Sequence, residues 1–385
     1  MAEQPVDVLL IGGGVAAVRC ARRLRRRKFG GSILLVGDEP HAPYNRPPLS
    51  KELLRDEVRT ELVLAEPPTW YERHGVGLRT DVAVTRLDAG ERLATLADGS
   101  RIRYGRCLLA TGAAPRRPPI PGAEHAFLLR TLDDALRVRA RARDARGGHA
   151  VILGGGFIGV EVAASLAAGG MRVTVLELAP ALWGGVLGSE LSDWALDVLS
   201  AAGVTVRVRT AASRLEADGA WVGPERLEAD LLLAGVGVLP RDELARDAGL
   251  ACDDGILTDA SHATSASDVF AAGDAARVDG LRVEHWHAAR EGGERVALAM
   301  LGKALPPPRA PWVFSEFAGQ TLDVFGVASP ADERHTLGDL AAVAWLRDGV
   351  AIQLATINGA IPADAARAAI ERGAGLAELQ ALVPA

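Results

Sequence analysis

The chain has 385 residues, which is long enough for two or three domains, because single hydrophobic cores rarely grow beyond about 250–300 residues. Hydrophobic residues make up 49% of the sequence and charged residues 24%, a composition typical of globular proteins. The net charge of −6 argues against nucleic acid as the main partner, and no apolar run approaches the roughly 20 residues that span a bilayer. The first residues, 1–6, lack the apolar core of a secretory signal, so we expect a cytoplasmic protein. We expect it to be a monomer or a homodimer.

The chain opens with a strand, a glycine turn, a helix and a second strand. The apolar run 6–11 leads into Gly12-Gly13-Gly14, and a helical stretch follows to about Lys28. A second apolar run, 33–36, ends in the acids Asp38 and Glu39. Farther on, residues 107–110 predict a buried strand that ends at the small-residue turn Thr111-Gly112 before a proline-rich linker.

The opening pattern returns in the middle of the chain. The apolar run 150–153 leads into Gly154-Gly155-Gly156-Phe157-Ile158-Gly159, and a helix follows to about Ala168. A strand over 173–176 then ends in Glu177. One such glycine turn is a weak signal, but two copies in full context, each closed by an acid, predict two bound dinucleotides.

Each residue type in the repeated pattern has a separate physical role. The first glycine (Gly12, Gly154) permits the tight turn, and the second (Gly14, Gly156) lets the backbone approach a pyrophosphate. The third small residue (Ala17, Gly159) lets the helix pack closely on the strand. The helix N-terminus supplies free N–H groups to the phosphates, and the closing acid accepts hydrogen bonds from ribose hydroxyls.

The remainder of the chain predicts one more strand of the first domain and a small α+β domain. Residues 267–274 form a strand that ends in Gly273-Asp274, and Pro306-Pro307-Pro308 breaks the chain after a helix around 295–301. Strands are expected at 321–327, 341–346 and 351–356, and one or two helices at 363–382.

These landmarks, in this order, resemble the two-dinucleotide flavoprotein disulfide reductase superfamily. The block from His41 to Lys51 reads HAPYNRPPLSK and is similar to the P-Y-D-R-P-P-L-S-K block of oxygenase-coupled ferredoxin reductases. The resemblance implies an α/β fold with two Rossmann-like, glutathione-reductase-like domains and a C-terminal α+β domain. The FAD domain would span 1–112 and 240–305, the NAD(H) domain 113–239, and the C-terminal domain, 306–385, would pack over the flavin.

The resemblance also implies the residues that bind FAD. Gly12, Gly14 and Ala17 would hold the pyrophosphate, Asp38 or Glu39 the ribose, and Asp274 the ribityl chain. The remaining FAD contacts would come from Arg46, Lys51, Ala110, Thr111, Gly112, Gly273, Glu284, His285 and Trp286.

The nicotinamide cofactor would bind the second glycine loop. The residues implied are Gly154, Gly156, Phe157, Ile158, Gly159, Val236 and Gly237, with Glu161 near the nicotinamide. Lys51, Glu161, Glu284 and Trp286 would line the ring pair, and we call them catalytic in that sense only. Glu177 is followed by no arginine, so it favours NADH over NADPH, whose 2′-phosphate a carboxylate repels.

The implied activity is hydride transfer from NADH to FAD, followed by single-electron transfer to a ferredoxin-type iron–sulfur protein that serves an oxygenase. The three cysteines, Cys20, Cys107 and Cys252, form no C-x-x-C pair, which disulfide-reducing relatives need, and no metal site is expected. The basic run from Arg22 to Lys28 is a docking candidate for an acidic ferredoxin, or else the solvated end of the first helix.

Departures from the family pattern leave two alternatives open. Where relatives carry W-S-D-Q this chain reads Phe314-Ser315-Glu316-Phe317, and Ala288 and Gly292 replace an asparagine and a glutamine. A reshaped flavin pocket would fit a flavoenzyme that acts on a small organic substrate or on oxygen in secondary metabolism. An NADH-sensing interaction flavoprotein is the other alternative.

Overall fold

The computed structural model describes residues 3–383, which form two compact units, each built from separated stretches of the chain. The first unit comprises the residues up to Asn45, then Thr60–Ala114 and Leu239–Pro308; the second comprises Arg46–Arg59, Pro115–Val238 and the residues from Arg309 onward. The chain crosses between the two units five times: after Asn45, after Arg59, within β7 (Ala113–Pro115), within β15 (Val238–Pro240) and after Pro308. Within residues 3–383, no helix is both long enough and apolar enough to cross a membrane.

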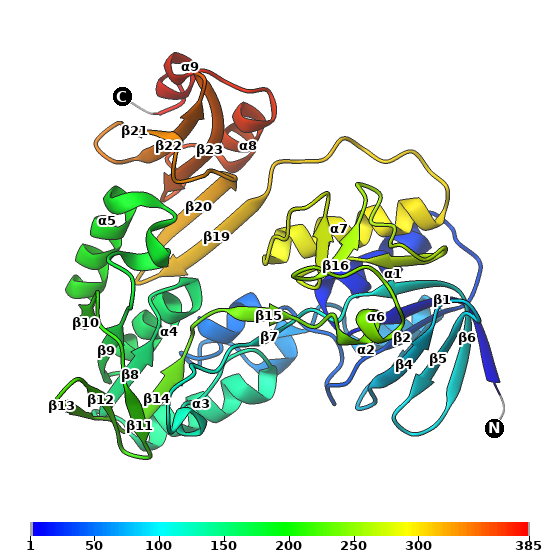
Figure 1. Cartoon of the computed structure of the whole chain (residues 1–385), viewed down its shortest axis with the longest axis horizontal. Coiled ribbons are helices and arrows are strands. Elements are labelled where there is room, and N and C mark those ends of the chain that lie inside the picture. The colour runs from blue at the N-terminus through cyan, green and yellow to red at the C-terminus, as the bar shows by residue number, and fades with distance from the viewer. Residues whose placement is uncertain (1–2, 384–385) are drawn as a thin grey trace. The chain divides into compact units, whose positions relative to one another are not determined.

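The first unit is organised by a seven-stranded sheet (Figure 1). Its strands run in the order β3-β2-β1-β6-β5-β4, and β17 pairs with β6. The bounds are β1 (Glu3–Ile11), β2 (Ile33–Val36), β3 (Val76–Arg79), β4 (Val84–Asp88), β5 (Leu93–Leu96), β6 (Arg101–Leu109) and β17 (Val269–Ala271). The pairs β1–β2, β2–β3, β1–β6 and β6–β17 are parallel, and the inner strand β2 and the last residues of β1 and β6 read as continuous apolar runs, as buried parallel strands do.

Both faces of this sheet are covered. Leu10 of β1 belongs to a core shared with α1 (Val15–Arg26) and α7 (Trp286–Met300), which pack against each other, while Leu9 belongs to a core on the opposite face. Successive residues of a strand point to opposite faces, so one strand serves two cores. The smaller elements are α2 (Pro68–Arg73), α6 (Glu243–Asp247), β16 (Ile256–Thr258), β18 (Ala276–Val278) and the short 3-10 helix η2 (Thr60–Val63).

The second unit contains a four-stranded parallel sheet in the order β10-β9-β8-β14. Its elements are β8 (His149–Leu153), α4 (Phe157–Ala168), β9 (Arg172–Leu176), α5 (Gly188–Ala201), β10 (Val204–Arg207) and β14 (Leu231–Ala234). The helix α3 (Leu132–Asp144) precedes β8, and its Thr131 N-cap closes a capping box with Asp134. A small antiparallel sheet of β11 (Arg214–Glu216), β12 (Gly219–Val222) and β13 (Glu225–Glu228) lies between β10 and β14 in the chain.

The C-terminal part of the second unit is a five-stranded antiparallel sheet in the order β19-β20-β23-β22-β21. The strands are β19 (Trp312–Phe317), β20 (Gln320–Gly326), β21 (Glu333–Leu337), β22 (Ala342–Arg347) and β23 (Val350–Ile357). The helices α8 (Ala363–Glu371) and α9 (Leu376–Gln380) share a core with these strands. Three further 3-10 helices in the unit are η1 (Pro47–Ser50), η3 (Ala123–His125) and η4 (Leu182–Gly185).

The predicted α/β class is confirmed, and the observed elements follow the predicted ones closely. Both predicted strand–glycine–helix–strand units are present, and the two C-terminal helices appear as α8 and α9. A hairpin at 347–349 joins β22 to β23, between the strands predicted at 341–346 and 351–356. The strand β19, in contrast, was not expected, and its partner is β20. The division of function between an FAD domain, an NAD(H) domain and a C-terminal domain stays a prediction.

A buried histidine lies beneath α7 in the first unit. His262 is 6% exposed, has a φ of 66°, and its Nδ1 lies 3.0 Å from the carbonyl oxygen of Ala271. A carbonyl can only accept, so Nδ1 carries the proton of the neutral ring. Burial lowers the pKa of His262 to about 4, because the charged imidazolium loses its hydration there.

We expect His262 to make the stability of the protein pH-dependent. The ring binds a proton in the unfolded chain near pH 6.5 but in the folded protein only near pH 4, so stability is complete above the unfolded pKa and is lost as pH falls through this window. The loss is about 3 kcal/mol at most, by linkage. Chemical denaturation between pH 7 and 4 measures it. The variant His262→Asn keeps an N–H donor and tolerates a positive φ, so its curve should be flatter; an unchanged slope would assign the effect elsewhere.

Candidate functional site

The first glycine turn lies in the first unit, between β1 and α1. Gly12 has a φ of +114°, and a Cβ at this position would lie 2.2 Å from the carbonyl oxygen of Ala110. The Gly12 N–H donates to Val36 at 2.8 Å, and the Ala110 N–H donates to Ile11 at 2.8 Å. The turn therefore joins the carboxyl ends of three neighbouring strands, where α/β sheets bind their ligands.

Open space lies over the next two glycines. Neither Gly13 nor Gly14 has any heavy atom within 4 Å of the position that a Cβ would take. Gly14 is the N-cap of α1, and no side chain caps this helix end. Backbone N–H groups at an uncapped helix N-terminus are suited to an anion such as a pyrophosphate. Ala17, fully buried, takes the third small position and packs in the core beneath the turn.

Both acids after β2 line a hollow beside this turn. The hollow is lined by Gly13, Leu35, Gly37, Asp38, Glu39, His41, Pro43, Tyr44, Leu78 and Thr80. Asp38 accepts from Arg241 at 2.7 Å, and Glu39 accepts from the hydroxyl of Tyr44. The geometry brings both predicted ribose acids to the site and does not choose between them.

The other predicted FAD residues of the first unit surround the same strand ends. Thr111 donates its hydroxyl to the carbonyl of Arg241 at 2.5 Å, next to Gly112, which has a φ of +74°. Gly273 and Asp274 follow β17, which pairs with β6 and so ends beside Ala110. These predicted FAD residues, from distant parts of the sequence, are thus gathered at one edge of one sheet, whereas Arg46 and Lys51, also predicted to contact FAD, belong to the second unit.

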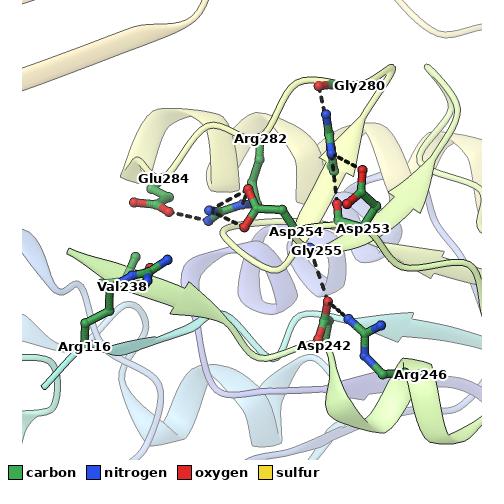
Figure 2. A network of polar contacts seen from close by, with 11 residues as sticks. Arg116, Val238, Asp242, Arg246, Asp253, Asp254, Gly255, Gly280, Arg282 and Glu284 are labelled. Atoms are coloured by element: carbon green, nitrogen blue, oxygen red, sulfur yellow. Dashed lines mark hydrogen bonds and ion pairs between the residues drawn. The ribbon is translucent and has the colours of Figure 1, made fainter. Parts of the chain in front are cut away.

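Glu284, His285 and Trp286 lie at the start of α7. His285 is the N-cap of this helix, and the indole N–H of Trp286 donates to Asn45 at 3.0 Å. Glu284 is ion-paired with Arg282, whose guanidinium also contacts both carboxylate oxygens of Asp254 at 3.1 Å (Figure 2). Any cofactor contact of Glu284 must therefore share this carboxylate with Arg282.

The second glycine turn lies between β8 and α4 in the second unit. Gly154 has a φ of +100°, and a Cβ at Gly159 would lie 1.9 Å from the carbonyl oxygen of Gly154, so the helix packs as closely as predicted. A Cβ at Gly156 would have only one heavy atom within 4 Å, the carbonyl oxygen of Gly235 at 3.9 Å. Phe157 and Ile158 are the first residues of α4, and Val236-Gly237 follow β14 at the same edge of the sheet.

The acid at the end of β9 supports this turn directly. Glu177 is 9% exposed; its Oε2 accepts from the N–H of Gly155 at 2.5 Å and its Oε1 accepts from the N–H of Ala179 at 2.7 Å. No arginine follows it in sequence, but the backbone of the exposed Arg209 donates to the carbonyl of Ala179 at 3.0 Å. The fold therefore brings the backbone of an arginine beside Ala179, two residues after Glu177, which the sequence did not indicate.

Replacing Glu177 should change the choice of nucleotide. In the variant Glu177→Ala we expect kcat/KM for NADH to fall about 10–100-fold, because a charged hydrogen bond contributes about 1.5–3 kcal/mol, and the NADPH-to-NADH ratio of kcat/KM to rise. Glu177→Gln removes the charge and keeps an acceptor for the Gly155 N–H, so it separates repulsion of a phosphate from support of the loop. Glu228→Ala, whose side chain is 91% exposed, is the control. An unaltered ratio in both Glu177 variants would contradict the assignment.

A buried ion pair joins two of the predicted catalytic residues. The Lys51 ammonium lies 2.7 Å from Oε2 of Glu161, and their side chains are 6% and 4% exposed. Arg46, at the start of the same segment, donates to the carbonyl of Arg130 at 2.6 Å. The Lys51 ammonium also lies 5.7 Å from the ring centroid of Phe314, in range of a cation–π interaction.

The structure also locates the cysteines and the basic run from Arg22 to Lys28. Cys20 and Cys107 are fully buried, and burial raises the pKa of both thiols, so they stay protonated. In the basic run, Arg25 donates to the carbonyls of Phe29, Gly31, His74 and Gly75 and therefore has a structural role. Arg26, Arg27 and Lys28 are exposed.

Sequence reasoning missed two side chains that contact Glu161. Ser50 and Ser315, which come from η1 and β19, both donate to its carboxylate. Ser50 lies in the block from His41 to Lys51 and Ser315 in the segment from Phe314 to Phe317, but only the fold shows that both contact one carboxylate.

The residues present fit FAD. The first unit offers an uncapped helix N-terminus under open space, and a hollow with two acids lies beside it. The second unit repeats the turn and the closing acid. The fold and the site together define an oxidoreductase with two dinucleotide sites, and the chain belongs to the pyridine nucleotide-disulphide oxidoreductase family, whose model matches residues 6–293.

Within that family the chain is similar to ferredoxin reductases. It is 39% identical over 360 residues to the ferredoxin reductase component of chlorobenzene dioxygenase from Cupriavidus sp. strain PS12, covering 89% of this chain and 87% of that protein. It is 37% identical over 349 residues to the biphenyl dioxygenase system ferredoxin–NAD(+) reductase component of Paraburkholderia xenovorans strain LB400, covering 86% and 84%.

A solved structure agrees with these sequence matches. The crystal structure of a covalent putidaredoxin reductase–putidaredoxin complex matches with a TM-score of 0.91 and 30% identity, over 97% of this chain and 94% of that one. The predicted fold, the predicted class of NAD(P)H-dependent flavoprotein reductase and the predicted cofactors, FAD and NADH, are thereby confirmed.

Proposed function

We propose that this protein carries electrons from NADH through FAD to a ferredoxin-type iron–sulfur protein that serves an oxygenase. The observation that carries the proposal is the pair of nucleotide cradles, each with space above its second glycine and an acid after its second strand. The names of the relatives support the choice of acceptor, since they are ferredoxin reductase components of dioxygenase systems.

The residues of the first unit would hold FAD. The N–H groups at the start of α1 would receive its pyrophosphate, Asp38 or Glu39 its ribose, and Asp274 its ribityl chain. The start of α7, with its N-terminal dipole and Trp286, would face the flavin, where negative charge on the reduced ring is stabilised by such a dipole. When bound, FAD supplies the change from two-electron to one-electron chemistry.

The residues of the second unit would hold and orient NADH. Gly154 and Gly156 leave room for its pyrophosphate, and Glu177 accepts hydrogen bonds from its ribose hydroxyls. Lys51 and Glu161 would lie beside the reacting rings, and their low exposure supports a role in keeping water out of that place. These roles rest on the residue-by-residue match to the family.

The acceptor would dock through charge. An acidic ferredoxin needs a basic surface, and Arg26, Arg27 and Lys28 at the end of α1 are exposed and free of the structural role of Arg25. We also propose a cytoplasmic location, because Cys20, Cys107 and Cys252 are all free thiols, as in a reducing compartment.

The test is anaerobic stopped-flow reduction of the purified protein by NADH and by NADPH, followed by mixing with ferredoxins of the same organism. We expect fast reduction by NADH and then rapid one-electron reoxidation. Fast reduction without reoxidation by any ferredoxin would favour a small organic substrate or oxygen as acceptor, which the change to Phe314 would accommodate. Slow reduction by both nucleotides would contradict the reductase and favour an NADH-sensing role.

A further inference from the structure

Glu161 receives hydrogen bonds from two separate parts of the second unit. Its Oε2 accepts from the Ser50 hydroxyl at 2.5 Å and from the Lys51 ammonium at 2.7 Å, and its Oε1 accepts from the Ser315 hydroxyl at 2.8 Å. Ser50 and Lys51 end the η1 segment, while Ser315 lies in β19, and all four side chains are buried, with Ser315 only 1% exposed. A single carboxylate therefore links α4 to η1 and to the C-terminal sheet.

The hydroxyls of Ser50 and Ser315 have few competing hydrogen-bond acceptors among the described residues. A serine has one O–H, and the other acceptor near Ser50, the carbonyl of Pro47, is 3.5 Å away. The backbone carbonyl of Ser50 is itself held by the hydroxyl of Ser165 at 2.7 Å, which fixes the segment against α4. Ser315 is held in register by β20, where it pairs with Leu322. Both donors are thus directed at Glu161 by rigid backbone.

This arrangement compensates for a costly burial. A carboxylate and an ammonium taken out of water lose hydration, and their mutual attraction offsets that loss only when the remaining oxygens and protons are also bonded. The serines supply the remaining donors. Among the described residues, Oε1 of Glu161 accepts one hydrogen bond, from Ser315. The Ser315 hydroxyl therefore determines the direction in which the free lone pair of Oε1 points.

We propose that Ser50 and Ser315 are positioning residues for NADH oxidation: they fix the orientation of the Glu161 carboxylate and, through it, of the Lys51 ammonium. The proposal rests on the proposed function, which places this ion pair beside the reacting rings. Without a serine the carboxylate turns toward its remaining donors, and the ammonium, which also donates to the carbonyl of Pro47 at 3.2 Å, shifts with it. Binding of the nucleotide elsewhere, through the glycine turn and Glu177, does not depend on this orientation.

The test is anaerobic reduction of FAD-loaded Ser315→Ala and Ser50→Ala over a range of NADH concentrations. We expect the limiting reduction rate to fall about tenfold or more, as for loss of an interaction needed in the transition state, while the apparent Kd for NADH changes less than about threefold. Ser315→Thr keeps the hydroxyl and should recover most of the rate. Thr356→Val, which removes another fully buried hydroxyl in β23 of the same unit, is the matched control.

Two further measurements keep the proposal falsifiable if a serine variant is also less stable. In the Glu161→Gln background, Ser315→Ala should have at most about a twofold additional effect, because residues that act through one group are not additive. The charge-transfer absorbance that follows reduction should weaken in Ser315→Ala and return in Ser315→Thr. The proposal is wrong if the serine variants lose no more rate than Thr356→Val, or if the effects of Ser315→Ala and Glu161→Gln simply add. If the unmodified protein is not reduced by NADH at all, the proposed function fails instead.

Discussion

The variant Gly14→Ala should fold and yet be purified without FAD. The added Cβ meets no protein atom within 4 Å, and the φ of −85° at Gly14 suits alanine. Its methyl group would instead occupy the space over the α1 N-terminus into which we place the pyrophosphate. We expect FAD affinity to fall at least about 100-fold, near 3 kcal/mol, and the apoprotein to keep its helix content. The FAD released per chain and the far-UV circular dichroism measure the two outcomes.

Two other glycine variants serve as controls for Gly14→Ala. Gly30→Ala also adds a Cβ to open space, but in the turn after α1, and should keep its FAD. Gly12→Ala places its Cβ 2.2 Å from the carbonyl of Ala110 and at a φ of +114°, so it should damage the fold itself. Normal FAD content in Gly14→Ala would mean that the pyrophosphate lies elsewhere.

The variant Gly156→Ala should remain yellow but need a much higher NADH concentration for its reduction. The second turn repeats the geometry of the first, since the φ of Gly156 is −75° and its Cβ would meet only the carbonyl of Gly235, at 3.9 Å. The protein itself accommodates the methyl group, whereas a nucleotide backbone lying against Gly156 does not. We expect the apparent Kd for NADH to rise about 100-fold, again near 3 kcal/mol.

The two glycine variants control each other. Gly156→Ala should hold as much FAD as the unmodified protein and should still be reduced by dithionite, which needs no nucleotide site. Gly14→Ala should fail at the earlier step of FAD binding. If Gly156→Ala lost FAD, or if it were reduced by NADH at the normal rate, the assignment of the second turn to the nicotinamide nucleotide would be wrong.

The parts of the fold that the sequence predicts are those with local causes. A strand, a glycine turn, a helix and a second strand lie within about 30 residues, so the whole pattern can be read in one short stretch of sequence. The close contacts of Gly12 with Ala110 and of Gly154 with Gly235, in contrast, come from strands far along the chain. The predicted run 33–36 and the predicted helix end at Ala168 agree with β2 and α4. This locality explains why the amino-acid pattern alone predicts where the two glycine turns lie; the cofactor contacts assigned to them stay predictions.

The features that the sequence did not predict depend on distant contacts. Lys51 and Glu161 are 110 residues apart, and Ser315 is 154 residues from Glu161. The periodicity of apolar residues in a sequence carries no information about contacts between residues so far apart. β19 was not predicted because it directly follows a proline-rich stretch and its sequence does not alternate clearly between apolar and polar residues. Its place in the sheet depends on pairing with β20. The position of Arg209 beside Ala179 likewise follows from strand order, β9 next to β10.

The interleaved course of the chain has a consequence for its synthesis. The first unit needs β17 and α7, which the ribosome makes only after all of residues 149–234, whereas the parallel sheet of the second unit is encoded in that one stretch. We expect this stretch to become protease-resistant in nascent chains before the N-terminal sheet does, because domains fold as their residues emerge. Limited proteolysis of stalled chains that end near Pro240 and near Pro308 would show the order. Neither unit can be made as one uninterrupted fragment, so gene truncation at any single point should leave an unfinished core.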